Sequence, residues 1–328
     1  MSTRPRLSVV VRSFNEERHI GRLLTGIVRQ THPTPEIVLV DSGSTDATVA
    51  IASQFPVQIV TITPAEFTFG RSLNRGVAAT RGDIVILASA HVYPRFDDWL
   101  ARMSEPFVDA QVALVYGKQR GDERTKFSEQ QIFRTWFPDE SNPNQTTPFC
   151  NNANAAIRRS EWVEMPYDEQ LTGLEDIDWG RRILARGKRI AYVAEAEVAH
   201  VHEETPSRIY NRYRREAIAL KRIFPEETFG LRDLARLWTT NVASDLAGAL
   251  RGSSPAKTIG EIVMFRSMQF WGTYRGYAQR DPADDELRRR LYYPNDRGAK
   301  VPAAAQQQRP IDYSRTGPIG VVKNVEEK

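Results

Sequence analysis

The first half of the chain contains short apolar runs, separated by segments in which apolar residues recur every three or four positions. Apolar runs of about five residues are typical of buried parallel strands. We therefore predict strands at 7–11, 36–40, 57–62, 83–87, 113–116, 153–157, 189–193 and 196–201.

The segments between these runs have helical periodicity. Ile20, Leu23, Leu24 and Ile27 would share one apolar face of a helix that is polar elsewhere. Strands that alternate with helices of this length predict an α/β fold with a doubly wound, mostly parallel sheet. The other helices predicted here are one capped by Ser44 or Thr45, one over 72–80 and one that ends at Gly187.

The pattern changes near Pro206, after which strand signals are few. The predicted helices of this half lie at 207–224, 231–250 and 255–279. Beyond Arg297 the chain is rich in proline, glutamine and small residues, and it has little apolar periodicity. These changes predict three parts: an α/β catalytic domain over 1–205, a helical region over 206–297 and a disordered tail over 298–328.

The arginines of the second half change this picture more than the net charge does. A formal charge of +4 in 328 residues does not indicate a nucleic-acid partner. The helix predicted at 207–224 is basic and amphipathic, so it could lie on an anionic membrane surface or bind a lipid diphosphate. The same pattern is explained if the basic side of this helix faces solvent and its apolar side packs on a core. The helices would then pack on the α/β domain or on a second copy of the chain.

Three features bear on the compartment. The single cysteine, Cys150, excludes an intramolecular disulfide and fits a reducing compartment. The first residues lead directly into an apolar strand run, so we expect no secretory signal peptide. No apolar run is long enough to span a bilayer. We therefore predict a cytoplasmic protein, and the basic helices leave peripheral contact with the inner face of the membrane open.

Polar side chains follow three of the predicted strands, at 12–17, 41–46 and 89–91. In a parallel α/β sheet, ligands bind in the crevice outside the carboxyl ends of the strands. The carboxylate of Asp41 could accept hydrogen bonds from a ribose or a base, and the small residues after it let the backbone turn closely around a ligand. The same residues could instead only build a tight turn and cap a helix.

Four motifs occur in this order along the first half. They are residues 8–17, the turn Asp41-Ser-Gly-Ser-Thr-Asp46, residues 69–76 and Arg81-Gly82-Asp83. As a set they resemble the family-2 glycosyltransferases, which adopt the GT-A fold and use nucleotide-sugar donors. The resemblance covers residues 6–205.

The resemblance implies particular donor contacts. Ser13, Glu16 and Asp41 are expected to line the nucleoside pocket. Arg71 and Asn74 lie on the helix predicted next, where family members often contact the donor. Arg71 could equally be a solvated surface charge.

The family pattern is broken where the resemblance implies a metal site. Family members usually carry Asp-x-Asp at the end of the fourth strand, where the carboxylates hold a divalent cation that bridges the donor diphosphate. Aligning on Pro94 and Trp99 puts Ser89-Ala90-His91 at this position.

Three roles stay open for His91, and Ser89 is expected beside it at the donor. His91 could ligate a metal, donate a hydrogen bond to the diphosphate directly, or be structural. Histidine is a common transition-metal ligand and a poor ligand for Mg²⁺, so a divalent cation here is expected to be Mn²⁺ rather than Mg²⁺.

Two further histidines bear on this choice. His200 and His202 alternate along a predicted strand, so they should point to opposite faces, and only one can face the site. The family often has a histidine near here that completes the metal or diphosphate shell, and His202 matches it by position. His202 could instead cap the strand in a polar loop. The metal ligands predicted from the resemblance are therefore His91 and His202.

An acidic segment follows Gly173. Glu175, Asp176 and Asp178 lie in the first turn of a predicted helix, where the helix dipole favours carboxylates in any protein. In the resembling family a Glu-Asp pair at this point marks the acceptor side, and its aspartate is the general base. The resemblance thus implies that Asp176 removes the acceptor proton and Glu175 positions the acceptor, with Asp178 as the alternative. Amide side chains nearby that could bind sugar hydroxyls are Asn151, Asn152 and Asn154.

The sequence therefore predicts an inverting glycosyltransferase that moves a sugar from a nucleotide sugar to a glycan or lipid-linked acceptor in surface polysaccharide biosynthesis. The loss of Asp-x-Asp leaves a second hypothesis open, a catalytically weak or inactive partner subunit that binds nucleotide sugars. The polar segment 121–147 is long enough to form a mobile loop that closes over the donor.

Overall fold

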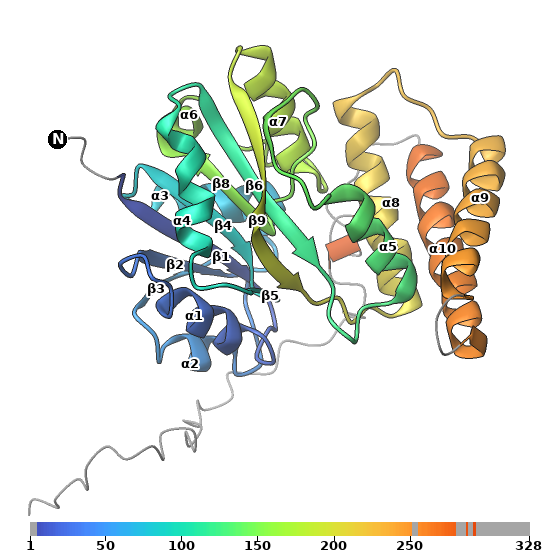
Figure 1. Ribbon diagram of the computed structural model, residues 1–328, viewed down its shortest axis with the longest axis horizontal. Coiled ribbons are helices and arrows are strands. Elements are labelled where there is room, and N and C mark those ends of the chain that lie inside the picture. The colour runs from blue at the N-terminus through green and yellow to red at the C-terminus, as the bar shows by residue number, and fades with distance from the viewer. Residues whose placement is uncertain (1–4, 251–254, 280–286, 288–290, 293–328) are drawn as a thin grey trace, which may run out of the picture. The chain divides into compact units, whose positions relative to one another are not determined.

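The computed structural model describes residues 5–250, 255–279, 287 and 291–292, which all belong to one compact unit (Figure 1). The strands are β1 Leu7–Ser13, β2 Glu36–Asp41, β3 Val57–Thr61, β4 Ile84–Ser89, β5 Val92–Pro94, β6 Val112–Arg120, β7 Asn142–Gln145, β8 Asn154–Arg158 and β9 Arg189–His200. The helices are α1 Ile20–Val28, α2 Thr48–Ala52, α3 Phe69–Ala78, α4 Trp99–Ser104, α5 Phe127–Trp136, α6 Arg159–Glu164, α7 Glu175–Ala185, α8 Pro206–Ile223, α9 Leu231–Ala249 and α10 Pro255–Tyr277, with a 3₁₀ turn η1 at Glu105–Val108.

The strands form one mixed sheet in the order β3-β2-β1-β4-β8-β6-β9-β5, and β7 pairs with β9. Strands β3, β2, β1 and β4 are parallel to one another. β8 runs antiparallel to β4 and to β6, so β6 and its parallel partner β9 run in the same direction as β4. The predicted α/β sheet is confirmed. Because these strands share a direction, β1, β2, β4, β6 and β9 all end at one edge, which we call the carboxyl edge.

Each face of the sheet carries its own apolar layer. Along β1, Val9 and Val11 pack with residues of α1, α2 and α4, whereas Val10 packs with residues of α3, α6 and α7. Because helices cover both faces of the sheet, successive residues of a parallel strand are all buried, and the strand is a continuous apolar run in the sequence. Burying each such side chain contributes roughly 1.5–3 kcal/mol relative to exposure. The rigid sheet between the two layers therefore fixes where its strand ends lie.

Three details of the prediction are wrong. The two strands predicted at 189–193 and 196–201 are one strand, β9. The segment 121–147 contains α5 and β7 rather than a single open loop. α2 begins only at Thr48 and has no side-chain cap, because Ser44 and Thr45 bond to the loop at Asn15 instead.

The helical region begins after Thr205, whose side chain accepts a hydrogen bond from the N–H of Arg208, and Pro206 opens α8. α8 packs on α10 and α5 through Ile209, Tyr213, Phe265 and Ile132. Asp245 of α9 and Arg266 of α10 form a buried bidentate ion pair with N···O distances of 2.8 and 3.0 Å.

No described helix is both long and apolar enough to cross a membrane. The boundary at 205/206 stays a prediction. The predicted tail 298–328 lies outside the described residues.

Candidate active site

Three predicted site residues lie side by side at the carboxyl edge. Ser13 ends β1, Asp41 ends β2 and Ser89 ends β4. Ser13 pairs with Asp41 in the β1–β2 register, and its hydroxyl donates to Oδ1 of Asp41 at 3.4 Å. Ser89 pairs with Arg12, the neighbour of Ser13 on β1. The sheet thus brings together strand ends that are far apart in the sequence.

The buried carboxylate of Asp41 holds its own turn. Oδ2 accepts hydrogen bonds from the N–H groups of Gly43 and Ser44, both at 3.0 Å, and Oδ1 accepts from the Ser44 hydroxyl at 2.5 Å. Gly43 has a φ of 86°, and a Cβ there would lie 2.8 Å from Cδ of Pro64. The turn-building role that the sequence left open is therefore present, and it fixes the shape of this strand end.

The loop after β1 is fastened to the loop after β2. Asn15 has a φ of 54°, a left-handed conformation that Asn tolerates better than most residues. Its side-chain oxygen accepts from the N–H of Thr45 at 2.8 Å, and its own N–H donates to the Ser44 hydroxyl at 2.9 Å. The N–H of Glu16 donates to Oγ1 of Thr48 at 2.7 Å. These bonds give both loops a defined shape, as expected of a preformed pocket.

Glu16 also contacts the residue that stands in place of Asp-x-Asp. Nδ1 of His91 donates to Oε1 of Glu16 at 2.7 Å. Burial alone would raise the pKa of Glu16 and lower the pKa of His91. The opposite charges and the hydrogen bond outweigh burial, so the pKa of Glu16 is lowered and the pKa of His91 is raised. The pair therefore favours the carboxylate and the imidazolium.

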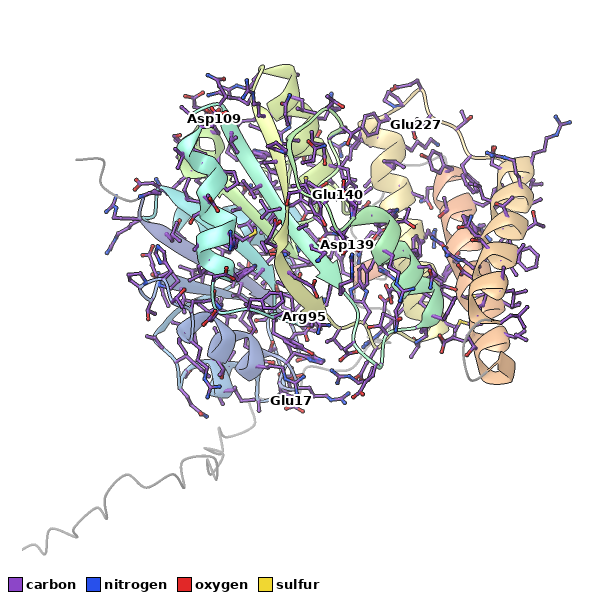
Figure 2. All side chains as sticks on the ribbon, in the orientation of Figure 1. Glu17, Arg95, Asp109, Asp139, Glu140 and Glu227 are labelled. Atoms are coloured by element: carbon purple, nitrogen blue, oxygen red, sulfur yellow. The ribbon has the colours of Figure 1, made fainter. Side chains whose placement is uncertain are left out.

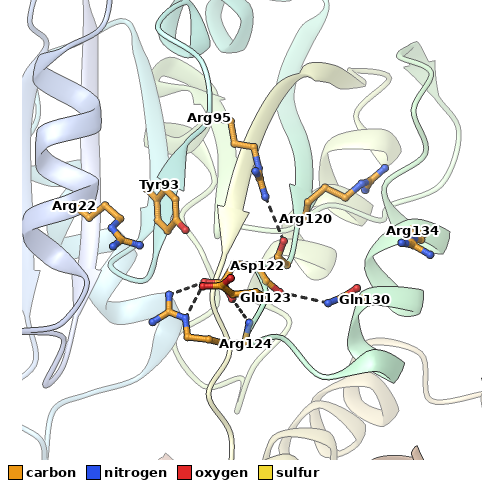
Figure 3. A pocket seen from close by; sticks show the side chains of 10 residues that line it. Arg22, Tyr93, Arg95, Arg120, Asp122, Glu123, Arg124, Gln130 and Arg134 are labelled. Atoms are coloured by element: carbon orange, nitrogen blue, oxygen red, sulfur yellow. Dashed lines mark hydrogen bonds and ion pairs between the residues drawn. The ribbon is translucent and has the colours of Figure 1, made fainter. Parts of the chain in front are cut away.

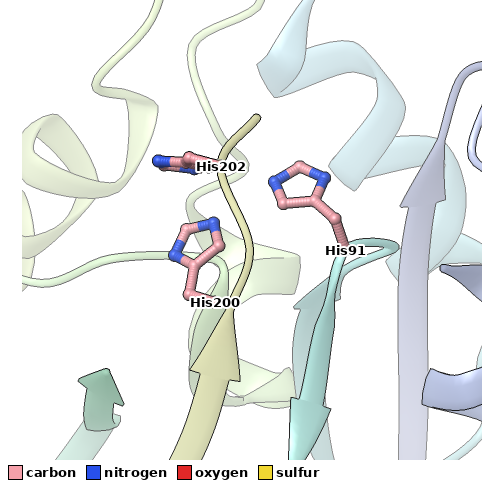
Figure 4. Close-up of side chains that lie close together, drawn as sticks. All are labelled: His91, His200 and His202. Carbon is pink, nitrogen blue, oxygen red and sulfur yellow. The ribbon is translucent and has the colours of Figure 1, made fainter. Parts of the chain in front are cut away.

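His91, His200 and His202 lie together, and we call them the histidine cluster (Figure 4). One ring nitrogen from each lies within 4.8 Å of one from each of the others. The prediction that His200 and His202 point to opposite faces is wrong. Residues two positions apart in a strand lie on the same face, so His202, which directly continues β9 past His200, lies on the same side as His200.

Glu129 of α5 ties the helices to this cluster. Its Oε1 accepts from Nδ1 of His202 at 2.6 Å and from Arg212 of α8 at 2.7 Å. Burial alone would raise the pKa of Glu129, but His202 and Arg212 outweigh burial and hold that pKa well below its usual range. The segment predicted as a mobile loop is therefore bonded to the carboxyl edge through α5.

The acceptor-side carboxylates open α7. Leu174 before them has a φ of 56°, which is strained for a bulky residue and is often found at functional sites. Asp176 is buried; its Oδ2 accepts from the N–H of Asn152 at 3.0 Å and its Oδ1 from the N–H of Ile177 at 2.8 Å. Burial, together with the charge of Glu175, raises the pKa of Asp176 to about 7. A carboxylate with this pKa is suited to take up a proton near neutral pH.

Glu175 joins this acceptor corner, which comprises Asn152, Glu175 and Asp176, to the end of β1. Its Oε1 lies 3.7 Å from Nη1 of Arg12 and accepts from the side-chain amide of Asn152 at 3.4 Å. The guanidinium of Arg12 also lies 4.9 Å from the ring centroid of Phe69. Arg12 therefore connects the donor strand ends to the acceptor corner.

Other acceptor-side predictions have their polar atoms engaged within the protein. Asp178 forms ion pairs at 3.1 and 2.8 Å with two arginines of its own helix. The amide of Asn154 is fully buried and bonds to Trp99 and to two backbone carbonyls. Asn151 is partly buried, and its Oδ1 accepts from the N–H of Ala153 at 3.0 Å. We carry only Asn151 forward as an acceptor contact, because the side chain of Asn152 is buried and bonds to Glu175 and Tyr167.

Arg71 and Asn74 of α3 share Glu169 as a partner. Nε of Arg71 donates to Oε2 of Glu169 at 2.7 Å, and Nδ2 of Asn74 donates to Oε1 at 3.0 Å. The oxygen of Asn74 accepts from Nε1 of Trp162 at 2.9 Å and from the N–H of Tyr167 at 3.0 Å. Asn74 thus fastens α3 to the segment before α7, whereas the Arg71 side chain keeps 37% of its surface exposed. Of the two, Arg71 is the better donor contact.

A hollow of about 640 Å³ lies between α1, β5 and α5 (Figure 3). Five arginines line it: Arg22, Arg95, Arg120, Arg124 and Arg134. Three of them form ion pairs with carboxylates at 2.6 to 3.0 Å, among them Arg120 with Asp139, which Figure 2 labels. The hollow shares no lining residue with the histidine cluster or the acceptor corner, so we do not place the active site there.

Sequence reasoning missed four side chains that shape the site. Arg12 had a usable signal, because strand alternation puts it on the opposite face of β1 from Ser13. Gln119, Glu129 and Arg212 carry no local motif, and they reach the histidine cluster only through the pairing of β6 with β9 and the packing of α5 and α8.

Comparison with known proteins gives one family match and several relatives. Residues 8–162 match the family described as Glycosyl transferase family 2. The O-antigen chain rhamnosyltransferase WbaN of Salmonella anatum is 29% identical over 197 residues, which cover 56% of this chain and 62% of that protein. The O-antigen chain rhamnosyltransferase RfbN of Salmonella typhimurium is 27% identical over 221 residues, which cover 63% and 70%. The chain thus spans less than two thirds of the first relative.

Solved structures share the fold. The mannosyltransferase PcManGT from Pyrobaculum calidifontis, in complex with GDP-Man and Mn²⁺, superposes with a TM-score of 0.56 at 20% identity, over 90% of this chain and 89% of that one. Glucosyl-3-phosphoglycerate synthase from Mycobacterium tuberculosis, with Mn²⁺, UDP and glucosyl-3-phosphoglycerate, gives 0.52 at 20% identity, over 69% and 82%. The family match over residues 8–162 and the two relatives support the resemblance to glycosyltransferase family 2, and the solved structures show that the fold is shared.

Proposed function

We propose that this glycosyltransferase moves a sugar from a nucleotide-sugar donor to a hydroxyl of a glycan or lipid-linked acceptor, with inversion at the anomeric carbon. The observation that carries the proposal is Asp176, a buried carboxylate at the start of α7 whose pKa is raised to about 7. The two O-antigen chain rhamnosyltransferase relatives support a role in surface polysaccharide biosynthesis. They also make a rhamnosyl donor the first one to try.

The proposed reaction is a single displacement. The acceptor oxygen forms a bond to the anomeric carbon as the bond from that carbon to the diphosphate oxygen breaks, and the leaving diphosphate keeps the electron pair. The proton of the acceptor hydroxyl passes to Asp176. A base with a pKa near the working pH contributes about 10²–10⁴-fold to such a step.

Glu175 has a positioning role in this proposal. Arg12 and Asn152 hold its carboxylate at the acceptor corner, where it can accept a hydrogen bond from a second acceptor hydroxyl. Because Glu175 lies next to Asp176, its charge also contributes to the raised pKa of the base. The proposal therefore gives the two carboxylates different tasks.

The donor end combines shape and charge. We propose that Ser13 and Glu16 contact the nucleoside, while Asp41 acts mainly by fixing the turn that its oxygens hold. Arg71 retains exposed surface for a donor contact. Arg12 supplies positive charge between the two halves of the site.

The side chains at the Asp-x-Asp position fit a transition-metal cation better than Mg²⁺. Mg²⁺ is held by carboxylate and water oxygens, and Ser89-Ala90-His91 supplies no carboxylate. The imidazoles of His91 and His202 suit an ion such as Mn²⁺ better, and we propose them as its ligands. When bound, a divalent cation neutralises charge that develops on the leaving diphosphate.

Peripheral membrane contact and self-association stay predictions for the helical region. α10 exposes Ile259, Val263 and Trp271, of which Trp271 is 44% exposed. We propose this face for either contact, because one helix face presents all three. Sedimentation of the full chain with anionic vesicles, before and after all three are changed to serine, separates the cases. Loss of sedimentation supports membrane contact, and a smaller oligomer by light scattering supports self-association.

A donor screen followed by product analysis tests the proposed function. Thermal shift with UDP-, GDP-, dTDP- and CMP-sugars identifies the donor, because a ligand that binds only the folded state raises its stability. NMR of the transferred sugar then gives the anomeric configuration, which we expect to be opposite to that of the donor. Retention of configuration, or no shift with any nucleotide sugar, would overturn the proposal.

A further inference from the structure

The histidine cluster has an order that a chance grouping of imidazoles would lack. Nδ1 of every ring is hydrogen-bonded to a side-chain oxygen from another part of the chain. The pairs are His91 with Glu16 at 2.7 Å, His200 with Gln119 at 2.6 Å and His202 with Glu129 at 2.6 Å. Carboxylate and amide oxygens accept, so Nδ1 carries a proton in each ring, and in the neutral imidazole Nε2 carries a lone pair.

One of these lone pairs is buried with nothing to accept. Nε2 of His200 has no hydrogen-bond partner among the residues that the structure describes, and His200 is only 5% exposed. A buried polar atom without a partner is costly, and native proteins contain few of them. The side chains of His91 and His202 beside it are 28% and 14% exposed, so a small ligand can approach from solvent.

We propose that His91, His200 and His202 bind one transition-metal ion of the Zn²⁺ class through their Nε2 atoms. Histidines that ligate a metal almost always donate their other ring N–H to a carboxylate or carbonyl oxygen, and all three rings have this arrangement. One nitrogen of each ring already lies within 4.8 Å of the others. Nitrogens about 2.0 Å from a tetrahedral zinc ion lie roughly 3.3 Å apart, so side-chain shifts on the order of 1 Å complete the site.

The third imidazole changes which metal is expected. Two histidines with water oxygens would suit Mn²⁺, but three nitrogen ligands favour Zn²⁺ and Co²⁺. Mn²⁺ has the lowest affinity of the divalent first-row ions for such sites, and Mg²⁺ prefers oxygen ligands altogether. The cluster therefore predicts that Zn²⁺ and Co²⁺ bind more tightly than Mn²⁺, and Mn²⁺ more tightly than Mg²⁺.

A competing ligand set is less suitable. Glu129 and Glu204 also offer oxygens within 4.8 Å of a nitrogen of His202. Both carboxylates are already engaged, because Nη2 of Arg212 lies 2.7 Å from each of them. A metal ion between them would face that guanidinium, so the three rings are the better ligands.

Three protein ligands leave a fourth tetrahedral position open, as in catalytic rather than structural zinc sites. We assign that position to a diphosphate oxygen of the donor, and this assignment alone rests on the proposed function. Metal binding by the rings does not depend on it.

Metal uptake by the purified full-length protein tests the site without measuring activity. The protein is stripped with a chelator and titrated with Co²⁺, whose visible absorption bands are intense in tetrahedral sites and weak in octahedral ones. We expect one Co²⁺ per chain with intense bands, displacement by one equivalent of Zn²⁺, and no displacement by a roughly 1000-fold excess of Mg²⁺.

His200→Asn is the deciding variant. The amide nitrogen of Asn takes the place of Nδ1 and can keep the bond to Gln119, whereas the ligand atom Nε2 is lost. We expect Zn²⁺ to bind at least about 100-fold more weakly, since loss of an outer hydrogen-bond partner alone costs about 10–100-fold. His32→Ala is the matched control, because His32 lies before β2, outside the cluster, and its Nδ1 bonds to the carbonyl of Pro33. It should bind Zn²⁺ as the wild type does.

Wild-type Zn²⁺ affinity in His200→Asn, weak octahedral bands, or displacement by Mg²⁺ would each overturn the site. Thermal melting without metal shows whether His200→Asn folds. If it does not fold, His91→Ala replaces it in the same comparison, because His91 is more exposed and its loss also removes a ligand. Donor binding is measured separately, both in excess chelator and with saturating Zn²⁺. A chain that binds Zn²⁺ but no nucleotide sugar contradicts only the proposed function, and the reverse result contradicts only the metal site.

Discussion

The acceptor corner contains carboxylates and the histidine cluster is hydrogen-bonded to others, and their surroundings shift the pKa values in opposite directions. At the acceptor corner, burial and the neighbouring Glu175 raise the pKa of Asp176 to about 7. At the histidine cluster, burial alone would raise the pKa values of Glu16 and Glu129 as well. Imidazole and guanidinium groups beside them outweigh burial, so both pKa values are lowered.

This difference gives the same functional group two roles. A carboxylate whose pKa lies near the working pH can take up a proton during turnover. A carboxylate whose pKa lies well below that pH stays charged and can orient imidazole rings through its hydrogen bonds. One corner is therefore built to move a proton, and the other to hold positive charge.

Asp176→Asn tests the acceptor corner and should have the largest effect on transfer. It keeps the shape of the side chain but removes the base, so kcat for transfer should fall by about 10²–10⁴-fold. The donor-induced thermal shift should be retained. Asp178→Asn is the matched control, because Asp178 is paired with arginines of its own helix. If Asp176→Asn stays active and Asp178→Asn is inactive, Asp178 rather than Asp176 is the general base.

His91→Ala tests the histidine cluster. It removes the ring that Glu16 holds, so donor-dependent transfer should fall by roughly 100-fold. Glu16 also loses the opposite charge that lowers its pKa. Full wild-type activity in excess chelator would contradict the metal account and leave direct contact of the imidazole with the diphosphate as the role of His91.

The raised pKa of Asp176 also predicts how stability depends on pH. Its ordinary pKa is 3.8 and the folded value is about 7, so folding favours the protonated form. The stability that this provides is fully present below pH 3.8 and is lost as pH rises through about 7. Asp176→Asn cannot ionise, so its melting temperature should exceed that of the wild type at pH 8 and approach it at pH 4. A difference that does not change with pH would contradict the pKa shift.

Gly43→Ala should have the smallest effect and should act on the donor end alone. The φ of 86° and the contact of 2.8 Å with Pro64 both oppose a Cβ, and we expect a loss of about 1–2 kcal/mol in folding stability. Gly187→Ala is the control, since its φ of 73° carries the same strain but no atom of the described residues lies within 4 Å of the added Cβ. Donor affinity should fall in Gly43→Ala and not in Gly187→Ala; equal donor affinities would contradict a shaping role for the turn at Asp41.

The acceptor corner could be predicted from the sequence because its signals are local. Glu175 and Asp176 are adjacent, and they open a helix whose periodicity is visible in the residues and whose end at Ala185 lies two residues before the predicted end at Gly187. The ends of β1, β2 and β4 were predicted for the same reason, since each apolar run stops at a polar segment. The shared direction of parallel strands then brings those ends together.

The histidine cluster could not be predicted in the same way. Its rings and their partners come from the loop after β1, from the ends of β4, β6 and β9 and from α5. Apart from the short spacing of His200 and His202, no spacing in the sequence relates them. The prediction of opposite faces for His200 and His202 failed because residues two positions apart in a strand share a face. The end of β9 at His200 depends on pairing with β5 and β6 rather than on residue type. The orphaned Nε2 of His200 appears only once the side chains are packed.

The pH dependence of transfer tests the role of Asp176 most directly. With the donor found by thermal shift and with metal saturating at every pH, kcat/KM is measured from about pH 5 to 9. The proposed base predicts a rise of about tenfold per pH unit that levels off near pH 7, where Asp176 becomes ionised. A rate that is flat across this range, or that falls as pH rises through 7, would contradict Asp176 as the base.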